Sequence, residues 1–250
     1  MNAPGIYYPQ AEWFQARIGI LTSSKIHAAI TKRQKGGTHD LVERRKLKLQ
    51  MISELRTGLT TEHFVSAAMD WGVENEPRAR AEYEFRTGRT VDQLGLVLHA
   101  DNPRFGATTD GFVAPEGILE IKCPETYTHY DYLTSGEIPK EYLDQIDWQM
   151  ACCGPEIEWC DFVSYDPRIE DDDENMLIIR HERNNKRIAE MEDLGTEFLA
   201  ETVAMFEQIK RGAKYPTTED KLRASIKKSR GQYTHEDAEL VAAFNEDIVP

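Results

Sequence analysis

Two charged residues interrupt an otherwise apolar stretch at residues 117–124, Gly-Ile-Leu-Glu-Ile-Lys-Cys-Pro. Side chains alternate between the two faces of a β-strand, so Glu120 and Lys122 would share one face while Leu119 and Ile121 point to the other. A charged pair in such a strand is costly to bury without partners. The stretch therefore predicts a central strand that carries a polar site on one face.

The preceding residues supply a partner for this pair. Residues 105–113 also have strand character, and residues 114–117, Ala-Pro-Glu-Gly, form a hairpin-type connection to the strand at 118–123. The symmetry of the hairpin brings Asp110 to within about one residue of facing Glu120, and facing side chains lie roughly 5 Å apart. Two carboxylates held this closely repel each other, and a divalent cation relieves the repulsion.

Oxygen ligands in this arrangement suit Mg²⁺. Asp110, Glu120 and the main-chain carbonyl of Ile121 are the expected ligands, and we expect two ions, for which Mn²⁺ can substitute. Lys122 can orient or deprotonate an attacking water and offset charge in the transition state. The pattern indicates a phosphodiester hydrolase. The alternative is a surface hairpin on which these side chains form ordinary cross-strand ion pairs.

The rest of the chain has the periodicity of an α/β protein. Strands are predicted at residues 91–98, 105–113, 118–123, 158–165 and 176–181. Helices are predicted at residues 13–30 (in short pieces), 41–55, 67–87, 127–135, 140–153 and 185–211. Thr22 or Ser23 is the expected N-cap of the helix that ends near Ile30. We expect the helix at 67–87 to break near Pro77 and to end at Gly88.

These elements predict helices packed around a central mixed sheet. We expect one domain over residues 1–212, made of a helical and basic part (1–90), a sheet core (91–182) and a long helix (185–211). Residues 213–250 form a predicted appendage with one helix near 235–245.

The net charge of −14 is unevenly distributed. Residues 1–56 hold ten basic and four acidic residues, a balance of +6, so the remaining residues carry −20. This clustering suits a surface that follows nucleic-acid phosphates, although a solvated helix face would have the same composition. The basic residues concerned are Arg17, Lys25, Lys32, Arg33, Lys35, Arg44, Arg45, Lys46 and Lys48.

No apolar run reaches the roughly 20 residues that a membrane-spanning helix needs, and the first residues lack the pattern of a secretory signal. A cytoplasmic location is therefore expected, where disulfides are rare. The four cysteines have no Cys-x-x-Cys spacing, so we expect buried apolar residues, with an iron–sulfur cluster as the alternative. They are Cys123, Cys152, Cys153 and Cys160.

Several short motifs follow one another in a specific order. They are Trp-Phe-Gln-Ala-Arg-Ile-Gly (13–19), Thr-Ser-Ser (22–24), Trp-Gly (71–72) leading to Glu76, Thr-Thr-Asp-Gly (108–111), Leu-Glu-Ile-Lys-Cys-Pro (119–124), Tyr142 with Gln145, and Tyr-Asp-Pro-Arg (165–168). From about residue 13 to 211 the chain resembles the phage lambda exonuclease family. These are YqaJ-like viral recombination nucleases within the PD-(D/E)xK restriction-endonuclease-like superfamily. The resemblance implies a restriction-endonuclease-like core.

The resemblance also implies roles for individual residues. Asp110 and Glu120 match the family's metal carboxylates, with Ile121 offering its carbonyl and Lys122 as the active-site lysine. Glu76 matches an acidic residue that holds a metal ion through water. Gln145 matches a glutamine that helps to position the attacking water. Without the resemblance, Glu76 would be interpreted as a carboxylate that stabilises the start of a helix, and Gln145 as a surface amide.

A second group matches the family's pocket for a 5′-phosphate. Arg17 and Ser24 correspond to residues that grip the phosphate, and Arg suits this role because its planar fork pairs with phosphate oxygens. Thr108 stands where the lambda protein has serine and keeps the hydroxyl. Trp13 is a candidate DNA contact. Taken singly, Arg17 would pair with Glu12, Ser24 would be an N-cap, and Trp13 would belong to the core.

The implied activity is Mg²⁺-dependent 5′→3′ exonuclease action on double-stranded DNA, which releases mononucleotides from the 5′-phosphorylated strand. The remaining 3′ single strand would serve annealing recombination. The implied partners are a single-strand annealing protein and two further copies of the chain in a trimeric ring, in a bacterial host cell that carries a phage or prophage. The alternatives are an endonuclease, a cysteine-cluster nuclease of the CRISPR-adaptation type, and a non-catalytic adaptor that binds a partner through its acidic surface.

Overall fold

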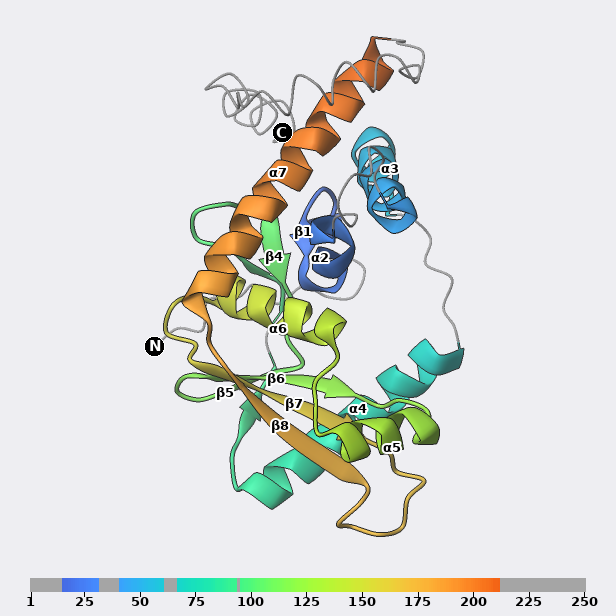
Figure 1. The fold of residues 1–250 in the computed structure, drawn as a ribbon, viewed down its shortest axis with the longest axis vertical. Helices are drawn as coiled ribbons and strands as arrows, with labels where there is room; N and C mark the ends of the chain where they lie inside the picture. The colour runs from blue at the N-terminus through green and yellow to red at the C-terminus, as the bar shows by residue number, and fades with distance from the viewer. Residues whose placement is uncertain (1–14, 32–40, 61–66, 94, 212–250) are drawn as a thin grey trace.

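The computed structural model describes residues 15–31, 41–60, 67–93 and 95–211. Its main sheet has five strands in the order β2-β5-β6-β7-β8 (Figure 1). Strands β6 and β7 run parallel and the other neighbours run antiparallel, so the predicted mixed sheet is confirmed. These strands are β2 (Val91–Asp92), β5 (Gly111–Val113), β6 (Gly117–Lys122), β7 (Trp159–Tyr165) and β8 (Met176–Glu182).

A second, three-stranded sheet has the order β1-β4-β3, and the sequence did not predict it. Its strands are β1 (Leu21–Thr22), β4 (Phe105–Ala107) and β3 (Val97–Leu98). The predictions of single strands at 91–98 and 105–113 are therefore wrong, because each is divided between the two sheets. Glycines allow the separate packing: a Cβ on Gly106 would lie 2.8 Å from Ile20 Cγ2, and one on Gly111 would lie 2.1 Å from Val91 Cγ1.

The helices predicted within the described residues are confirmed with small changes at their ends, and the helix predicted near 235–245 lies outside those residues. The confirmed helices are α2 (Ser23–Ile30), α3 (Val42–Thr57), α4 (Ala67–Thr87), α5 (Thr126–Ser135), α6 (Lys140–Cys153) and α7 (Asn185–Lys210). The expected break near Pro77 is wrong, since α4 continues through that residue. Gly88 ends the helix as predicted, with a φ of 67° and its N–H bonded to the Glu84 carbonyl.

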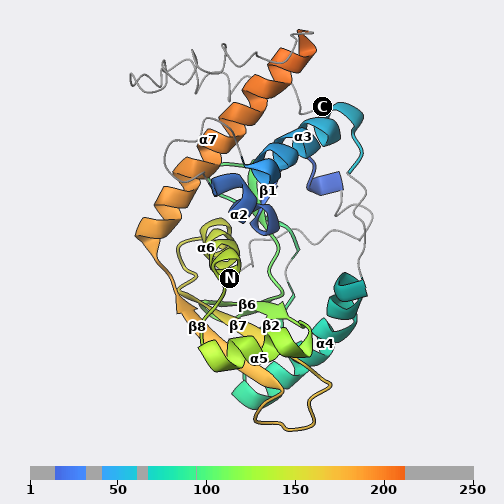
Figure 2. The same ribbon diagram turned by 45° about the vertical axis from the view of Figure 1, so that its right-hand side comes forward.

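Helix α6 lies between two cores (Figures 1 and 2). One face of it packs on the main sheet through Ile146 and Met150, together with Ile118 and Phe162. Its opposite face contributes Trp148 to a core formed with α2, α3 and α7. The other face of the main sheet is covered by α4, where Tyr83 packs with Leu119 and Ile121. Apolar packing on both sides therefore fixes α6 beside β6.

Two of the basic residues in the first part of the chain are structural. Arg44 and Lys48 of α3 are each only 3% exposed, and both contact Glu201 of α7, at 2.5 Å and 2.6 Å. Their inclusion in a phosphate-following surface is therefore wrong, because burial in an ion-paired helix contact keeps both side chains from a ligand. Lys32, Arg33 and Lys35 lie outside the described residues. No helix in the described ranges is both long and apolar enough to cross a bilayer.

Candidate active site

The hairpin geometry predicted for the two carboxylates is present. Strand β5 pairs antiparallel with β6 so that Gly111 lies opposite Leu119, and the Asp110 N–H bonds the Leu119 carbonyl at 3.0 Å. The next pair of residues along this ladder is Asp110 and Glu120. Glu120 is 1% exposed and shares the α6 face of the sheet with Ile118, as the alternation predicted.

Both oxygens of Glu120 accept hydrogen bonds from α6. Gln145 Nε2 donates to Oε1 at 2.7 Å, and Gln149 Nε2 donates to Oε2 at 2.6 Å. Lys122 Nζ also contacts Glu120 Oε1. The interpretation of Gln145 as a surface amide is therefore wrong. Gln149 was missed by the sequence analysis, although its spacing of four residues from Gln145 places both on one helix face.

Asp110 lies where its ionised form is unfavourable. Burial raises the pKa of its carboxyl group well above the usual value, and Glu120 and Glu76 raise it further, while Lys122 opposes the shift. The Ile121 N–H donates to Asp110 Oδ2 at 2.6 Å. Burial alone would lower the pKa of the Lys122 ammonium, but Glu120 and Asp110 outweigh this effect and raise it. The cluster therefore holds one cation against closely spaced carboxylates.

Helix α4 contributes a third carboxylate. Glu76 forms an ion pair with Arg80 one turn later, and Arg80 Nε donates to the Asp110 carbonyl at 3.1 Å. The alternative of helix-start chemistry for Glu76 is wrong, because the residue lies in the middle of α4. Arg80 was not predicted; the Glu-to-Arg spacing of four residues was the available signal.

These residues fit a hard divalent cation. Glu120 is buried and Asp110 half-buried, and the two carboxylates are adjacent and mutually repulsive, which is the arrangement that bound Mg²⁺ stabilises. In the described part of the chain, no three His, Cys, Asp or Glu side chains are gathered to hold a metal ion. Two carboxylates would thus need the Ile121 carbonyl, water or substrate oxygens as further ligands. Mg²⁺ accepts such a set because it keeps several waters.

Two of the predicted phosphate residues, Arg17 before β1 and Ser24 in α2, are also adjacent. Arg17 Nη2 lies 3.4 Å from Ser24 Oγ and 3.3 Å from Thr22 Oγ1. Thr22 is the N-cap of α2, as one of the two predictions had it, so the alternative of Ser24 as N-cap is wrong. Burial lowers the pKa of Arg17 to about 10, an effect that Glu54 partly offsets. Arg17 therefore remains a cation at neutral pH.

Thr108 connects this group to the carboxylates. Strand β1 pairs parallel with β4 so that Thr22 lies beside Gly106, two residues before Thr108. The Thr108 carbonyl accepts from Gln149 Nε2 at 3.0 Å, and the same amide nitrogen bonds Glu120. Thr108 Oγ1 is buried with no hydrogen-bond partner among the described residues. A buried hydroxyl without a partner is unusual, and a bound ligand would supply the missing hydrogen bond. Trp13 and Glu12 lie outside the described residues.

The cysteines do not form a cluster. Cys152, Cys153 and Cys160 are buried and Cys123 is half-buried, and all four are free thiols. Cys152 belongs to the core between α6 and α7, Cys153 and Cys160 belong to the core under α6, and Cys123 packs against the α4 core. Burial as small apolar residues is thus confirmed for the first three. The iron–sulfur alternative gains no support from this distribution.

Comparisons with known proteins agree with this geometry. Residues 12–156 match the model of the YqaJ-like viral recombinase domain. The crystal structure of an alkaline exonuclease from Laribacter hongkongensis is 40% identical, with a TM-score of 0.73 over 82% of this chain and 98% of that one. The same enzyme in complex with dAMP matches equally.

A more distant match shows the fold alone. A phage-related exonuclease from Haemophilus somnus 129PT is 13% identical, with a TM-score of 0.57 over 78% of this chain and 96% of that one. A search of curated proteins gave no match. The family match and the 40% identical structure together establish that the chain belongs to the YqaJ-like viral recombinase family, within the lambda exonuclease group.

Proposed function

We propose that this nuclease is a Mg²⁺-dependent 5′→3′ exonuclease that degrades the 5′-phosphorylated strand of duplex DNA to mononucleotides. Its membership in a nuclease family gives the general class of reaction. The observation that carries the finer proposal is the cluster of Asp110, Glu120 and Lys122, with Gln145 bonded to Glu120 at 2.7 Å.

Asp110, Glu120 and the Ile121 carbonyl would hold the metal, with Glu76 contributing through water. Mg²⁺ bound there supplies Lewis-acid activation of the phosphodiester and of water. Lys122 offsets negative charge that builds on the phosphorus oxygens in the transition state. Gln145 orients a water for in-line attack, since its amide is fixed by Glu120.

Arg17, Ser24 and Thr108 would bind the terminal 5′-phosphate, and Trp13 would contact DNA. Arg17 is the cation of this group, and the unpartnered Thr108 hydroxyl offers a further hydrogen bond. The Thr108 carbonyl shares an amide donor with Glu120, so a phosphate held here would lie next to the carboxylates. This arrangement would place the first phosphodiester over the metal and favour release of one nucleotide at a time.

The solved relative supports a mononucleotide product, since the alkaline exonuclease from Laribacter hongkongensis was crystallised with dAMP. We extend the proposal to a trimeric ring, a single-strand annealing partner and a phage or prophage origin, all of which follow from family resemblance. A cytoplasmic location, substitution of Mn²⁺ for Mg²⁺, and the division into a nuclease domain (1–212) and an appendage (213–250) also stay predictions.

The test compares three DNA substrates in Mg²⁺: a linear duplex with one 5′-phosphate, the same duplex with 5′-hydroxyl ends, and a covalently closed circle. We expect mononucleotides from the phosphorylated strand, slower release without the phosphate, and an intact circle. Lys122→Ala should lower the rate by about 100-fold or more, as expected when one transition-state donor is lost.

Lys186→Ala, an exposed lysine on α7, is the matched control and should retain the full rate. Digestion of the circle would instead favour an endonuclease. A Lys122→Ala variant with the parent rate would remove the proposed mechanism.

A further inference from the structure

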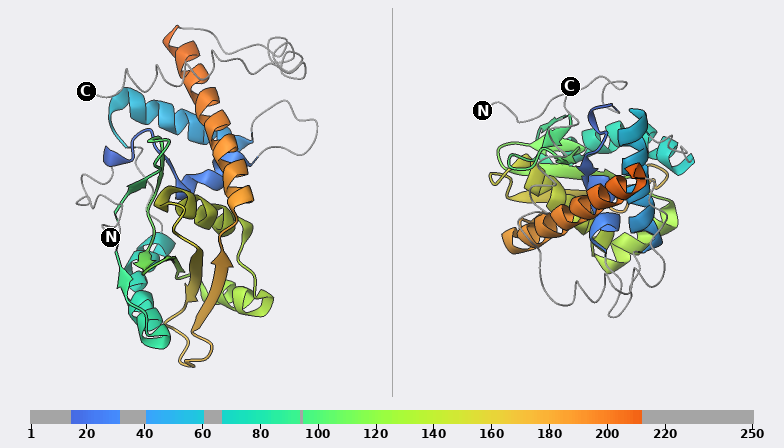
Figure 3. Two further views of the ribbon diagram at one scale, coloured as in Figure 1. Left: turned by 90° about the vertical axis from the view of Figure 1, so that its left-hand side faces the viewer. Right: turned by 90° about the horizontal axis from the view of Figure 1, so that it is seen from above.

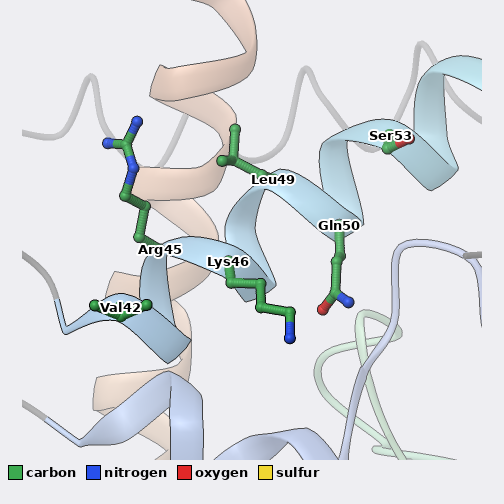
Figure 4. Close-up of a pocket in the computed structure, with 6 residues that line it drawn as sticks. All are labelled: Val42, Arg45, Lys46, Leu49, Gln50 and Ser53. Atoms are coloured by element: carbon green, nitrogen blue, oxygen red, sulfur yellow. The ribbon is translucent and has the colours of Figure 1, made fainter. Parts of the chain in front are cut away.

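One face of α3 lines an open groove that lies apart from the nuclease site. Its volume is about 480 Å³, and its lining residues are Val42, Arg45, Lys46, Leu49, Gln50 and Ser53 (Figure 4). The spacing of three and four residues places them along a single helix face. None belongs to the carboxylate cluster or to the Arg17 group.

The groove combines apolar and basic side chains. Val42 is 74% exposed and Leu49 is 37% exposed, while the opposite face of α3 buries Leu47 and Met51 in the core. Arg45 and Lys46 lie between the two exposed apolar residues, and the described residues of the lining include no acidic side chain. Such a surface fits an amphipathic segment that carries apolar and acidic residues, whereas a phosphate backbone alone would leave the apolar residues uncovered.

Residues 235–250 of this chain carry both apolar and acidic side chains. Residues 235–250 contain five acidic residues and no lysine or arginine. In the helix predicted near 235–245, a spacing of four residues would align Leu240 and Phe244 on one face, and Ile248 follows that helix. The acidic residues flank them; they are Glu236, Asp237, Glu239, Glu246 and Asp247.

The C-terminal part of α7 also lies close to α3, the helix that carries the groove. Arg44 and Lys48 of α3 contact Glu201 of α7, and the Arg56 guanidinium lies 5.9 Å from the Phe206 ring centroid. Helix α3 therefore crosses the C-terminal part of α7 (Figures 2 and 3). The 23 residues from 212 to 234 could span up to about 75 Å when extended, and α3 is only about 24 Å long, so reach does not limit the contact.

We propose that residues 235–250 dock in the groove of α3 in the same molecule, with the apolar residues against Val42 and Leu49 and the acidic residues beside Arg45 and Lys46. The tether favours this occupant over a separate partner, because a linked segment is present at a high effective concentration. The inference is independent of the nuclease chemistry, since it uses neither the carboxylates nor their metal.

The test places a photo-crosslinking residue, p-benzoylphenylalanine, at Leu49 of the full-length protein and identifies the crosslinked peptides by mass spectrometry. A mixture of isotope-labelled and unlabelled protein distinguishes crosslinks within one chain from those between copies. The matched control carries the same residue at Phe85, which is 84% exposed on α4. We expect crosslinks to residues 235–250 of the same chain at Leu49, at least about fivefold above the Phe85 control, as intramolecular tethering favours.

Charge reversal provides the second arm of the test. Lys46→Glu should lower the Leu49 crosslink yield about threefold, as expected for loss of exposed ion pairs. Changing Glu236, Asp237 and Glu239 together to lysine in that variant should restore it. Lys46 is exposed, so the melting temperature should not change. Crosslinks to another copy, to a different segment, or no higher than at Phe85 would overturn the proposal, as would a yield that Lys46→Glu leaves unchanged.

Discussion

At the scale of single residues, Gln149 is the side chain whose importance the sequence concealed. It is 0% exposed, and its amide nitrogen bonds both Glu120 Oε2 and the Thr108 carbonyl. If Glu120 binds the proposed metal ion, Gln149 is a positioning residue, because its hydrogen bond fixes the orientation of that carboxylate. It also connects Glu120 to Thr108, one of the proposed phosphate-binding residues.

We therefore predict that Gln149→Leu, which keeps the size but removes the amide, lowers nuclease activity by about 10- to 100-fold. It should also raise the Mg²⁺ concentration for half-maximal rate, since Glu120 is then less well oriented. A Mg²⁺ titration of the initial rate measures both effects. Gln50→Leu, on the exposed face of α3, serves as the control. An unchanged Mg²⁺ requirement with full activity would show that Gln149 only fills space.

At the scale of elements, α6 and α7 are joined by buried charges. Arg187 of α7 forms ion pairs with both Asp144 and Asp147 of α6, and these carboxylates are 1% and 0% exposed. His27 contacts Asp144 at 2.6 Å, and His181 contacts Asp147 at 2.8 Å. The Arg187 guanidinium thus bridges two buried carboxylates, and the histidines from α2 and β8, together with Lys140 at 3.7 Å from Asp144, complete the network.

Removing that guanidinium should destabilise the contact between the helices. Arg187→Met would leave two buried carboxylates without their shared cation, and we expect the free energy of unfolding to fall by about 3–5 kcal/mol. Arg187→Lys should cost less, because one charge remains without the bidentate fork. Lys186→Met, on the exposed side of α7, should change stability by less than about 0.5 kcal/mol. Urea unfolding measures all three, and equal losses in Arg187→Met and Lys186→Met would contradict the assignment.

The same elements show which parts of the fold local sequence patterns can predict. Helix α6 was predicted with its observed ends because Pro139 and Gly154 mark them locally, and the β5–β6 hairpin followed from its turn. The divided strands were missed because the pairing of β1 with β4 joins residues about 84 positions apart, and no local pattern encodes such a contact. Arg44 and Lys48 look like surface charges in the sequence because Glu201, which pairs with both, lies 157 and 153 positions away.

At the scale of the whole molecule, the proposed metal site predicts that stability depends on Mg²⁺. The pKa of Asp110 is raised by burial and then by Glu120 and Glu76, so its ionisation opposes folding. A raised carboxyl pKa means that stability present at low pH is lost as the pH rises through the folded-state pKa. Mg²⁺ bound between Asp110 and Glu120 would return that stability, and more of it at higher pH, because it favours the ionised pair.

Asp110→Asn separates this electrostatic effect from simple loss of packing. Without metal, the variant should melt at a higher temperature than the parent, since a neutral amide of the same shape no longer repels Glu120. Adding Mg²⁺ should raise the melting temperature of the parent but barely that of the variant. Asp131→Asn, an exposed aspartate on α5, is the control and should behave as the parent does. Equal Mg²⁺ stabilisation of the parent and Asp110→Asn would place the ion elsewhere, because the pair would then have no part in binding it.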